Sequence, residues 1–350
     1  MNRREFLLGG YATSTAMTVQ RIFGAQPRYK IGIDANSRSS NPETTWGGDP
    51  FRGFREAHEV GYTYMEVFAT NVSQYFPNDV DGLKKRIDEI GVKFEAVTGG
   101  VNPAAVAAMR AARGAGGGAR GRGETGGRGG GWPGGNTHFE DPASRQAVIE
   151  NHLGVVRFAK KFGCDHQKTN LGNRRPEGTT QEDLKNIAET VQILCKRSLE
   201  EEGLPFGIHA HLGSQFQTQS EIDYVMENTD PKYVKFILDT GHITMAGIDP
   251  VALTKKLGHR IIEFHLKDSK PEDRGGTKNV PGRDHDQMKD PYFFPMGNGG
   301  VDFPGIKAYL DSIQWSGWLT VELGTSPWRP PKESARISAK YIKETLKIPF

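Results

Sequence analysis

The chain has 350 residues, of which 36% are hydrophobic and 25% are charged, and its formal net charge at pH 7 is +3. This composition is typical of a globular protein, and so small a charge implies neither a nucleic-acid partner nor a membrane surface. The two cysteines, Cys164 and Cys195, exclude a framework of several disulfides and a cysteine-rich zinc site, and we expect both to be buried. The length suits two medium-sized domains or one large α/β barrel.

The first residues, MNRREFLLGGYATSTAMTVQRIFGAQ, resemble a twin-arginine export signal. Arg3 and Arg4 precede a mildly apolar stretch, and a Phe-Gly-Ala sequence at 23–25 offers a cleavage site. We therefore expect residues 1–27 to be a signal segment that directs the protein to the periplasm. If the signal is not functional, the protein stays in the cytoplasm. No other segment is long and apolar enough to span a bilayer, so stable membrane anchoring is not expected.

From residue 30 onward, short apolar runs alternate with amphipathic helical patterns. The predicted strands are 30–35, 63–68, 93–98, 165–171, 205–212, 235–239, 261–267 and 319–323. The predicted helices are 51–60, 79–90, 142–162, 181–202, 219–228, 250–257, 303–313 and 331–346. Strict alternation predicts a parallel sheet, and eight such units predict an α/β fold, a (β/α)8 TIM barrel forming a single domain over residues 28–350. An open doubly wound sheet would have a Gly-x-Gly-x-x-Gly turn after its first strand, but DANSRS stands there.

One stretch after the third strand interrupts this pattern. Residues 114–135, GAGGGARGRGETGGRGGGWPGG, contain thirteen glycines and cannot bury a core. Arg-Gly repeats can bind single-stranded RNA, but the simpler expectation is a disordered, flexible insertion. This insertion and the long connection 271–300 both follow the C-terminal ends of strands, where such barrels hold their active sites. The insertion is therefore placed to act as a flap over the site.

The last four predicted strands each bring an imidazole or a carboxylate to the C-terminal end. The residues in and just after these strand ends are His209, His211, Asp239, His242, His265, Lys267 and Glu322. Because strand ends converge in a barrel, we expect these side chains to form one polar cluster. A mixed set of nitrogen and oxygen ligands suits a divalent ion such as Mn²⁺, Zn²⁺, Co²⁺ or Fe²⁺. We therefore expect one ion per chain, with four ligands: His209, Asp239, His265 and Glu322.

Each of these residues, taken alone, also has an ordinary structural role. His211 can be a buried core histidine, Asp239 can cap the next helix, and Glu322 can pair with Lys267. His285, in GRDHDQ, lies in the connection after the seventh strand and is a candidate substrate contact. Four other histidines are expected on the surface: His58, His138, His152 and His259.

The motifs LDTGH, FHLKD, GNGGVDFPGI and VELG resemble those of the xylose isomerase-like TIM barrels. This family includes sugar phosphate isomerases/epimerases, ketose 3-epimerases and inosose dehydratases, and the resemblance covers residues 30–350 except the insertion. In the ketose epimerases the metal is held by Glu, Asp, His and Glu from the last four strands. The resemblance assigns the last three of these roles to Asp239, His265 and Glu322, and a substrate-binding role to His242. The fifth strand departs from the pattern, because His209 stands in place of the first glutamate.

The resemblance implies a metal-dependent isomerase or epimerase that acts on a sugar or keto-sugar through proton abstraction and an enediolate. Epimerisation needs two bases on opposite faces of the substrate. Glu322 can be one of them, but His209 cannot be the other if it binds the metal. His211, Lys267 or Glu66 (in YMEVF) can supply the missing group, and Glu66 is also a candidate substrate contact. Alternatively, one base suffices for elimination, which would make the protein a lyase or dehydratase acting on keto-glycosides or inososes.

Two further classes of function are less well supported by the sequence. Endonuclease IV shares this barrel and an Asp-Thr-x-His element, but its trinuclear zinc site needs histidines where this chain has FATN and VTGG. A sugar-binding barrel without catalysis would not need the full ligand set. We therefore expect a small carbohydrate as the substrate and no nucleic-acid partner. The sequence leaves open the exact substrate, the metal and whether the chain forms a homo-oligomer.

Overall fold

The computed structural model describes residues 28–35, 46, 50–72, 75, 79–100, 138–270, 293–323 and 330–350. Three features singled out in the sequence lie outside these residues: the signal-like segment 1–27, the glycine-rich insertion 114–135, and His285. Within the described part, no helix is both long and apolar enough to cross a membrane.

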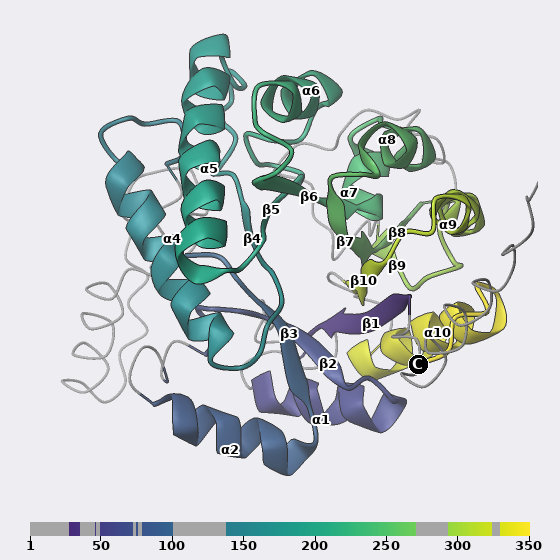
Figure 1. Cartoon of the computed structure of the whole chain (residues 1–350). Helices are drawn as coiled ribbons and strands as arrows, with labels where there is room; N and C mark the ends of the chain where they lie inside the picture. Colours follow the sequence, from purple (N-terminus) through teal and green to yellow (C-terminus); the bar gives the residue numbers. More distant parts are fainter. Residues whose placement is uncertain are drawn as a thin grey trace, which may run out of the picture.

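Eight parallel strands form the centre of the molecule (Figure 1). They are β1 (Tyr29–Asp34), β2 (Tyr64–Phe68), β3 (Lys93–Thr98), β4 (Gln167–Asn170), β5 (Phe206–His209), β6 (Val234–Asp239), β7 (Ile261–Leu266) and β10 (Gly317–Val321). Their order in the sheet is β3-β2-β1-β10-β7-β6-β5-β4. The two outermost strands also meet, because the Gly99 N–H donates to the Lys168 carbonyl over 3.1 Å. The sheet is therefore a nearly closed barrel, and the predicted TIM barrel is confirmed.

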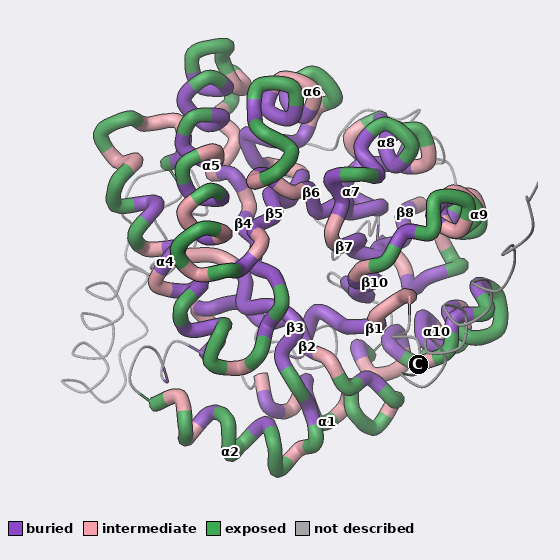
Figure 2. Tube along the Cα trace, viewed as in Figure 1, coloured by how far each residue is buried: buried purple, intermediate pink, exposed green. Residues whose placement is uncertain are grey.

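Helices surround this barrel, each covering the gap between neighbouring strands (Figure 1). They are α1 (Pro50–Val60), α2 (Val80–Ile90), α4 (Arg145–Lys160), α5 (Gln181–Glu202), α6 (Gln219–Glu227), α8 (Pro250–Leu257), α9 (Phe303–Ser312) and α10 (Pro331–Glu344). Figure 2 shows that the strands are almost wholly buried, whereas the helices are exposed along their outer sides. The main hydrophobic core accordingly lies between the strands and the inner faces of the helices.

The ends of these helices follow from local capping chemistry. Thr180 begins α5 with a capping box, in which its hydroxyl accepts the Asp183 N–H while the Asp183 carboxylate accepts the Thr180 N–H. The same helix ends at Gly203, which has a φ of 71° that favours glycine. A second capping box, between Thr218 and Glu221, starts α6. These caps set where the chain leaves each helix and returns to the barrel.

Three short elements near the strand ends were not predicted. They are the helix α7 (Thr240–Met245) and the antiparallel pair β8 (Asp268–Ser269) and β9 (Phe293–Phe294). Strand β5 is shorter than predicted, since it ends at His209, and His211 lies in the turn that follows, where its carbonyl accepts the Ser214 N–H. The prediction that this strand continues to residue 212 is therefore wrong, although the turn still brings the rings of His209 and His211 to 5.6 Å.

The buried and exposed histidines differ from the prediction at one position. His58, His138 and His259 are exposed, as expected, but His152 is only 1% exposed. The reason is that His152 lies on the inner face of α4, where the Nδ1–H donates to the Val148 carbonyl over 2.7 Å and Nε2 faces the Thr169 hydroxyl at 3.0 Å. Both cysteines are buried, as predicted.

Candidate metal centre

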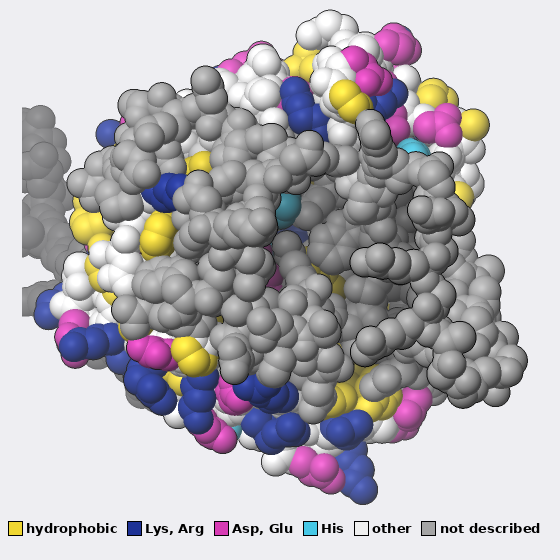
Figure 3. Space-filling model, turned by 180° about the vertical axis from the view of Figure 1, so that it is seen from behind, with side chains coloured by type: hydrophobic (Ala, Val, Ile, Leu, Met, Phe, Trp, Pro, Cys, Tyr) yellow, Lys and Arg dark blue, Asp and Glu magenta, His cyan; other side chains and the backbone are white. Residues whose placement is uncertain are grey.

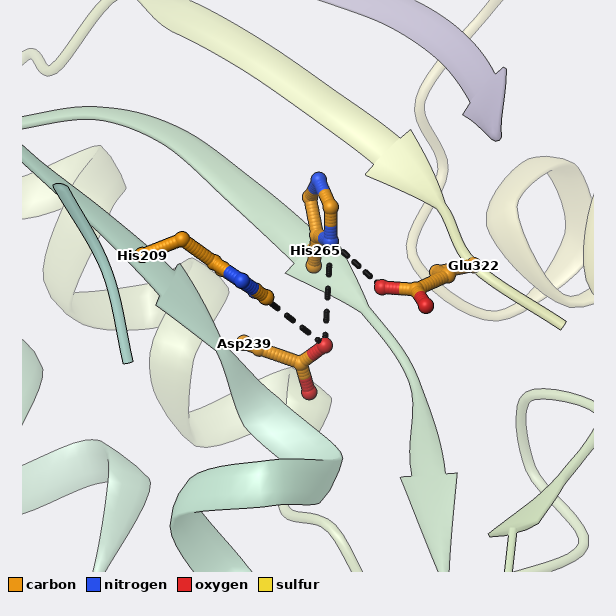
Figure 4. A group of neighbouring side chains, drawn as sticks. All are labelled: His209, Asp239, His265 and Glu322. Atoms are coloured by element: carbon orange, nitrogen blue, oxygen red, sulfur yellow. Dashed lines mark hydrogen bonds and ion pairs between the residues drawn. The ribbon is translucent and has the colours of Figure 1, made fainter. Parts of the chain in front are cut away.

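Four side chains from consecutive strand ends converge on one point (Figure 4). They are His209 from β5, Asp239 from β6, His265 from β7 and Glu322 directly after β10. Each offers one ligand atom, and all four atoms lie within 4.8 Å of one another. Every residue in the group is at most 3% exposed. Figure 3 shows the molecule from behind the view of Figure 1, and histidine and acidic side chains are visible near the middle of this face.

The nitrogen and oxygen atoms of the group face one another. Asp239 Oδ2 lies 3.6 Å from His209 Nε2 and 3.7 Å from His265 Nδ1, and His265 Nδ1 lies 2.5 Å from Glu322 Oε2. Among the described residues, neither His209 Nε2 nor Asp239 Oδ2 has a hydrogen-bond partner. Buried polar atoms nearly always have a partner; in the described part of the chain His209 Nε2 has none, and Asp239 Oδ2 lies 3.3 Å from the Lys267 ammonium, so both atoms are placed to bind a cation. Two imidazoles and two carboxylates are a donor set that binds divalent transition metals.

Neighbouring residues fix the orientation of His209 and Asp239. The Nδ1–H of His209 donates to Asn170 Oδ1 over 2.7 Å, which leaves the Nε2 lone pair directed at the group. Asp239 Oδ1 accepts the His242 N–H over 2.8 Å and so caps α7. The capping role weighed for Asp239 therefore coexists with its place in the cluster, because each role uses a different carboxylate oxygen.

Burial controls the charges in the group. Desolvation lowers the pKa of His209 to about 3, and the positive charge of Lys168 acts in the same direction. Burial also lowers the pKa of His242 well below its usual range. Both imidazoles are therefore neutral near pH 7, which is the form that binds metals. Burial raises the pKa of Asp239 to about 7, against the opposing effect of Lys267, so the ionised carboxylate depends on nearby positive charge.

Lys267 supplies that charge from beside the group. Its Nζ lies 2.7 Å from Glu322 Oε1, 3.3 Å from Asp239 Oδ2 and 2.9 Å from His242 Nε2. Gly241 makes room for it, since a Cβ at this position would be 2.7 Å from Lys267 Cγ. The Thr240 hydroxyl donates to the Lys267 carbonyl over 2.7 Å. In the LDTGH sequence, Asp239 is thus a candidate ligand, Thr240 binds the backbone carbonyl of Lys267, and Gly241 leaves space for the Lys267 side chain.

A stacked pair of imidazoles borders the group. The ring centroids of His211 and His242 are 3.7 Å apart, and Phe293 packs edge-on against His242 at 4.9 Å. The candidate catalytic residue His211 and the candidate substrate contact His242 therefore adjoin the proposed ligands. Phe293, which was missed, lies in a connection that carries no strong periodic signal in the sequence.

Glu66 lies on the other side of His265, within the barrel. Its Oε2 is 2.8 Å from His265 Nε2 and accepts from Lys168 Nζ over 2.6 Å, while its Oε1 accepts from the Thr98 hydroxyl over 2.6 Å. Glu263 joins this second group, because Glu66, Glu263 and His265 also offer ligand atoms within 4.8 Å of one another. Sequence reasoning missed Glu263 and Lys168. The signal for Glu263 is its position two residues before His265, which places it on the same strand face.

A small cavity of about 50 Å³ lies beside the metal-ligand group, over the ends of β2, β3 and β4. It shares Asn170 with the outer contact of His209, and its polar lining includes Thr70, Thr98, His152 and Thr169. None of the four proposed ligands lines this cavity, so Asn170 is its link to the candidate centre.

Comparisons with known proteins agree with this architecture. A family model described as xylose isomerase-like TIM barrel matches residues 54–345. Inosose dehydratase of Salmonella typhimurium (strain LT2) is 35% identical over 163 residues, which are 45% of this chain and 54% of that protein. The chain thus spans about half the length of this relative in the match.

Solved structures resemble the whole barrel at lower sequence identity. A sugar phosphate isomerase/epimerase from Parabacteroides distasonis has a TM-score of 0.63 and 17% identity, covering 92% of this chain and 100% of that one. The IOLI protein, in a structure with a binding zinc atom, has a TM-score of 0.60 and 15% identity, covering 92% and 99%. At these identities the likeness shows the fold alone. Together with the family model, it confirms the resemblance drawn from the motifs.

Proposed function

Because the chain belongs to the xylose isomerase-like TIM barrel family, we propose that it is a metal-dependent lyase that removes water from a keto-sugar or an inosose. A proton leaves the carbon next to the carbonyl, a C=C bond forms, and the hydroxyl on the following carbon departs as water. Relatives named inosose dehydratase support this class of reaction.

The observation that carries the proposal is the position of Glu66. Epimerisation by two carboxylates would need a second carboxylate facing the substrate, and Glu66 was one candidate for it. Glu66 instead lies on the side of His265 that faces away from the ligand group, where its oxygens contact His265 Nε2, Lys168 and Thr98. Of the carboxylates described at the centre, Asp239 and Glu322 remain. A reaction that needs one carboxylate base is therefore favoured over one that needs two.

The ion would be held by His209, Asp239, His265 and Glu322. A divalent ion at this place would polarise the substrate carbonyl and stabilise the negative charge that develops on its oxygen. The neutral state of His209, whose pKa burial lowers to about 3, keeps its nitrogen available. Asn170 and the α7 N-terminus hold two of these ligands in position, so that little reorganisation is needed on binding.

Glu322 is placed to remove the proton and Lys267 to deliver one. The Glu322 carboxylate takes the proton from the carbon, and the Lys267 ammonium protonates the departing hydroxyl. Because Glu322 Oε1 and Lys267 Nζ are 2.7 Å apart, the proton that Glu322 has taken can pass to Lys267 and restore both groups. His242, in contact with Lys267 at 2.9 Å, is placed to bind a substrate hydroxyl.

One observation favours an epimerase or isomerase as the second candidate. His211 stacks on His242 at 3.7 Å, and its imidazole could return a proton to the face opposite Glu322. In that case the product would be an inverted sugar that carries solvent hydrogen, and no water would be lost.

Proton NMR in heavy water distinguishes these reactions. Metal-loaded protein is incubated with a panel of inososes, ketoses and 3-keto-glycosides. Elimination is expected to replace the substrate signals by those of a dehydrated product, which are olefinic or, once the enol has become a ketone, those of a new CHD group. Inverted stereochemistry with deuterium at the reacting carbon, and no loss of water, would contradict the lyase and support the epimerase.

The Glu322→Gln variant then tests the role of the base. It keeps the shape and one acceptor oxygen, so we expect substantial metal to remain while turnover falls about 10²–10⁴-fold. Glu227→Gln, at an exposed position of α6, is the matched control and should retain full turnover. Exchange of the substrate proton at the normal rate in Glu322→Gln would assign the base to another group, with His211 first.

A further inference from the structure

The nitrogen of His265 that faces away from the ligand group lies among buried charges. Glu66 from β2, Lys168 from β4 and Glu263 from β7 are each at most 1% exposed. Lys168 Nζ lies 2.6 Å from Glu66 Oε2 and 3.5 Å from Glu263 Oε2. It also contacts His265 Nε2. Nε2 therefore faces an acceptor, Glu66, at 2.8 Å and a donor, the Lys168 ammonium, at the same time.

These two neighbours favour opposite tautomers of the ring. If Nε2–H donates to Glu66, the lone pair of Nδ1 points at Asp239 and Glu322 and can bind an ion. If Nε2 instead accepts from Lys168, the proton must be on Nδ1, where Glu322 Oε2 accepts it over 2.5 Å. In this second tautomer His265 cannot be a metal ligand. The position of one proton on the ring therefore decides whether the ligand set is complete.

We propose that Lys168 and Glu66 are opposing positioning residues that select the tautomer of His265. In the metal-free protein Lys168 donates to Nε2, and Nδ1–H is turned toward Glu322. When the ion binds, Nδ1 loses its proton to solvent, Nε2 gains one from solvent and donates it to Glu66, and the ring stays neutral. Lys168 keeps Glu66 and Glu263 as partners in both states, so releasing the ring leaves its charge balanced. This inference rests on the metal centre of the proposed function, and not on the elimination reaction.

The surrounding contacts support such a switch. Glu66 is held from its far side by the Thr98 hydroxyl, and Glu263 by His166 Nε2 at 3.0 Å. Both carboxylates therefore keep these contacts whether His265 Nε2 donates to Glu66 or accepts from Lys168. Outer-shell partners of metal-bound histidines change metal affinity by 10–100-fold when removed, so the two residues should have measurable effects of opposite sign.

Nitrogen-15 NMR of histidine-labelled protein reads the tautomer directly. The His265 signals are assigned by their loss in His265→Ala. In chelator-treated wild-type protein we expect the proton on Nδ1, and after zinc is added we expect it on Nε2. A metal-free protein that already carries the proton on Nε2 would overturn the proposal, without any variant being needed.

Zinc affinity in two variants gives an independent test. Glu66→Met removes the acceptor and should weaken zinc binding 10–100-fold, whereas Glu66→Gln, which keeps an acceptor oxygen, should restore part of the loss. Lys168→Met removes the competing donor and should tighten zinc binding by roughly tenfold, the effect of one hydrogen bond to a charged group. Glu227→Gln, at an exposed position of α6, is the control and should bind zinc like the wild type.

Equal losses of affinity in Glu66→Met and Lys168→Met would mean that both residues only support the fold, and would overturn the inference. If Lys168→Met does not fold, the comparison of tautomers in the wild-type protein still decides. Retention of zinc by His265→Ala would instead contradict the proposed centre itself, so the two failures are distinguishable.

Discussion

His152 should make the stability of the protein depend on acid pH. Burial lowers the pKa of this imidazole to about 4, whereas an unfolded histidine has a pKa near 6.5. Between these values the unfolded chain binds a proton that the folded chain does not, so stability falls as the pH is lowered from about 6.5 to about 4. At about 1.4 kcal/mol for each pH unit, the loss attributable to His152 is roughly 3 kcal/mol.

The measurement is the free energy of unfolding in urea, followed by circular dichroism at several pH values from 7 to 4 on chelator-treated protein. The variant His152→Gln retains a donor and an acceptor for Val148 and Thr169 but cannot titrate. At pH 7 the variant is expected to be less stable than the wild type. Its free energy of unfolding should fall less than that of the wild type when the pH is lowered from 7 to 4. Other acid-sensitive groups are common to both proteins and cancel in the difference. If the gap between the two proteins stays constant from pH 7 to 4, the reasoning about His152 is refuted.

Three other predictions follow from the centre and its surroundings. Elemental analysis should find one divalent ion per chain in the wild type and much less in Asp239→Asn and His265→Ala, and undiminished metal in both variants would contradict the ligand assignment. Replacing residues 114–135 with a short linker should leave the melting temperature almost unchanged, because the free-energy cost of closing a loop changes by only about 0.6 kcal/mol per doubling of its length. A large drop in melting temperature would show that the segment contributes to stability. Asp268→Asn should lower the free energy of unfolding, measured in urea, by about 1–3 kcal/mol. The reason is that the buried carboxylate accepts four N–H groups, from Ser269, Gly297, Gly299 and Val301. Wild-type stability in this variant would show that these N–H groups find other acceptors.

The strand ends were predictable because a barrel constrains them strongly. A carboxylate or imidazole that follows a buried apolar run can lie only at the mouth of the barrel, and four such runs in succession must converge. The structure brings His209, Asp239, His265 and Glu322 together for this reason. The strand in FILDTGH ends at Asp239, as its pattern indicates, but the helix that starts at the next residue was missed. One side chain that both ends a strand and caps a helix leaves no turn signal between the two.

The buried polar residues inside the barrel were harder to predict, because their partners are distant in sequence. Lys168 is 102 residues from Glu66 and Glu95 is 225 residues from Thr320, yet both pairs are hydrogen-bonded. Nothing in a local pattern indicates such a pairing. His152 is different, since its spacing of four residues from Val148 and from Val156 places it on the apolar face of α4. That periodicity was visible, but a polar residue on such a face was assigned to the surface.

The histidine at position 209 changes the charge of the centre as well as its donor atoms. The ketose epimerase pattern has three carboxylates, whereas this centre has Asp239 and Glu322 as its two anions, with His209 neutral. With the Lys267 ammonium close to both carboxylates, a divalent ion leaves the group with a net positive charge. A third carboxylate would bring it to neutrality. Positive charge fixed in a buried site favours the anion that forms when a proton leaves the carbon beside a carbonyl.

His209→Glu therefore tests whether this charge serves affinity or catalysis. The added carboxylate should tighten Mn²⁺ binding, because carboxylates suit this ion, and it should slow turnover of whichever substrate the NMR panel identifies. Lys267→Met keeps all four proposed ligands but removes the positive charge that contacts Glu322 and Asp239, so at saturating metal it should hold the ion and lose turnover. Both proteins are compared by Mn²⁺ titration and by initial rates at saturating metal. Unchanged or faster turnover in both variants would show that the positive charge has no part in the reaction, and that His209 is simply an alternative donor at a tolerant position.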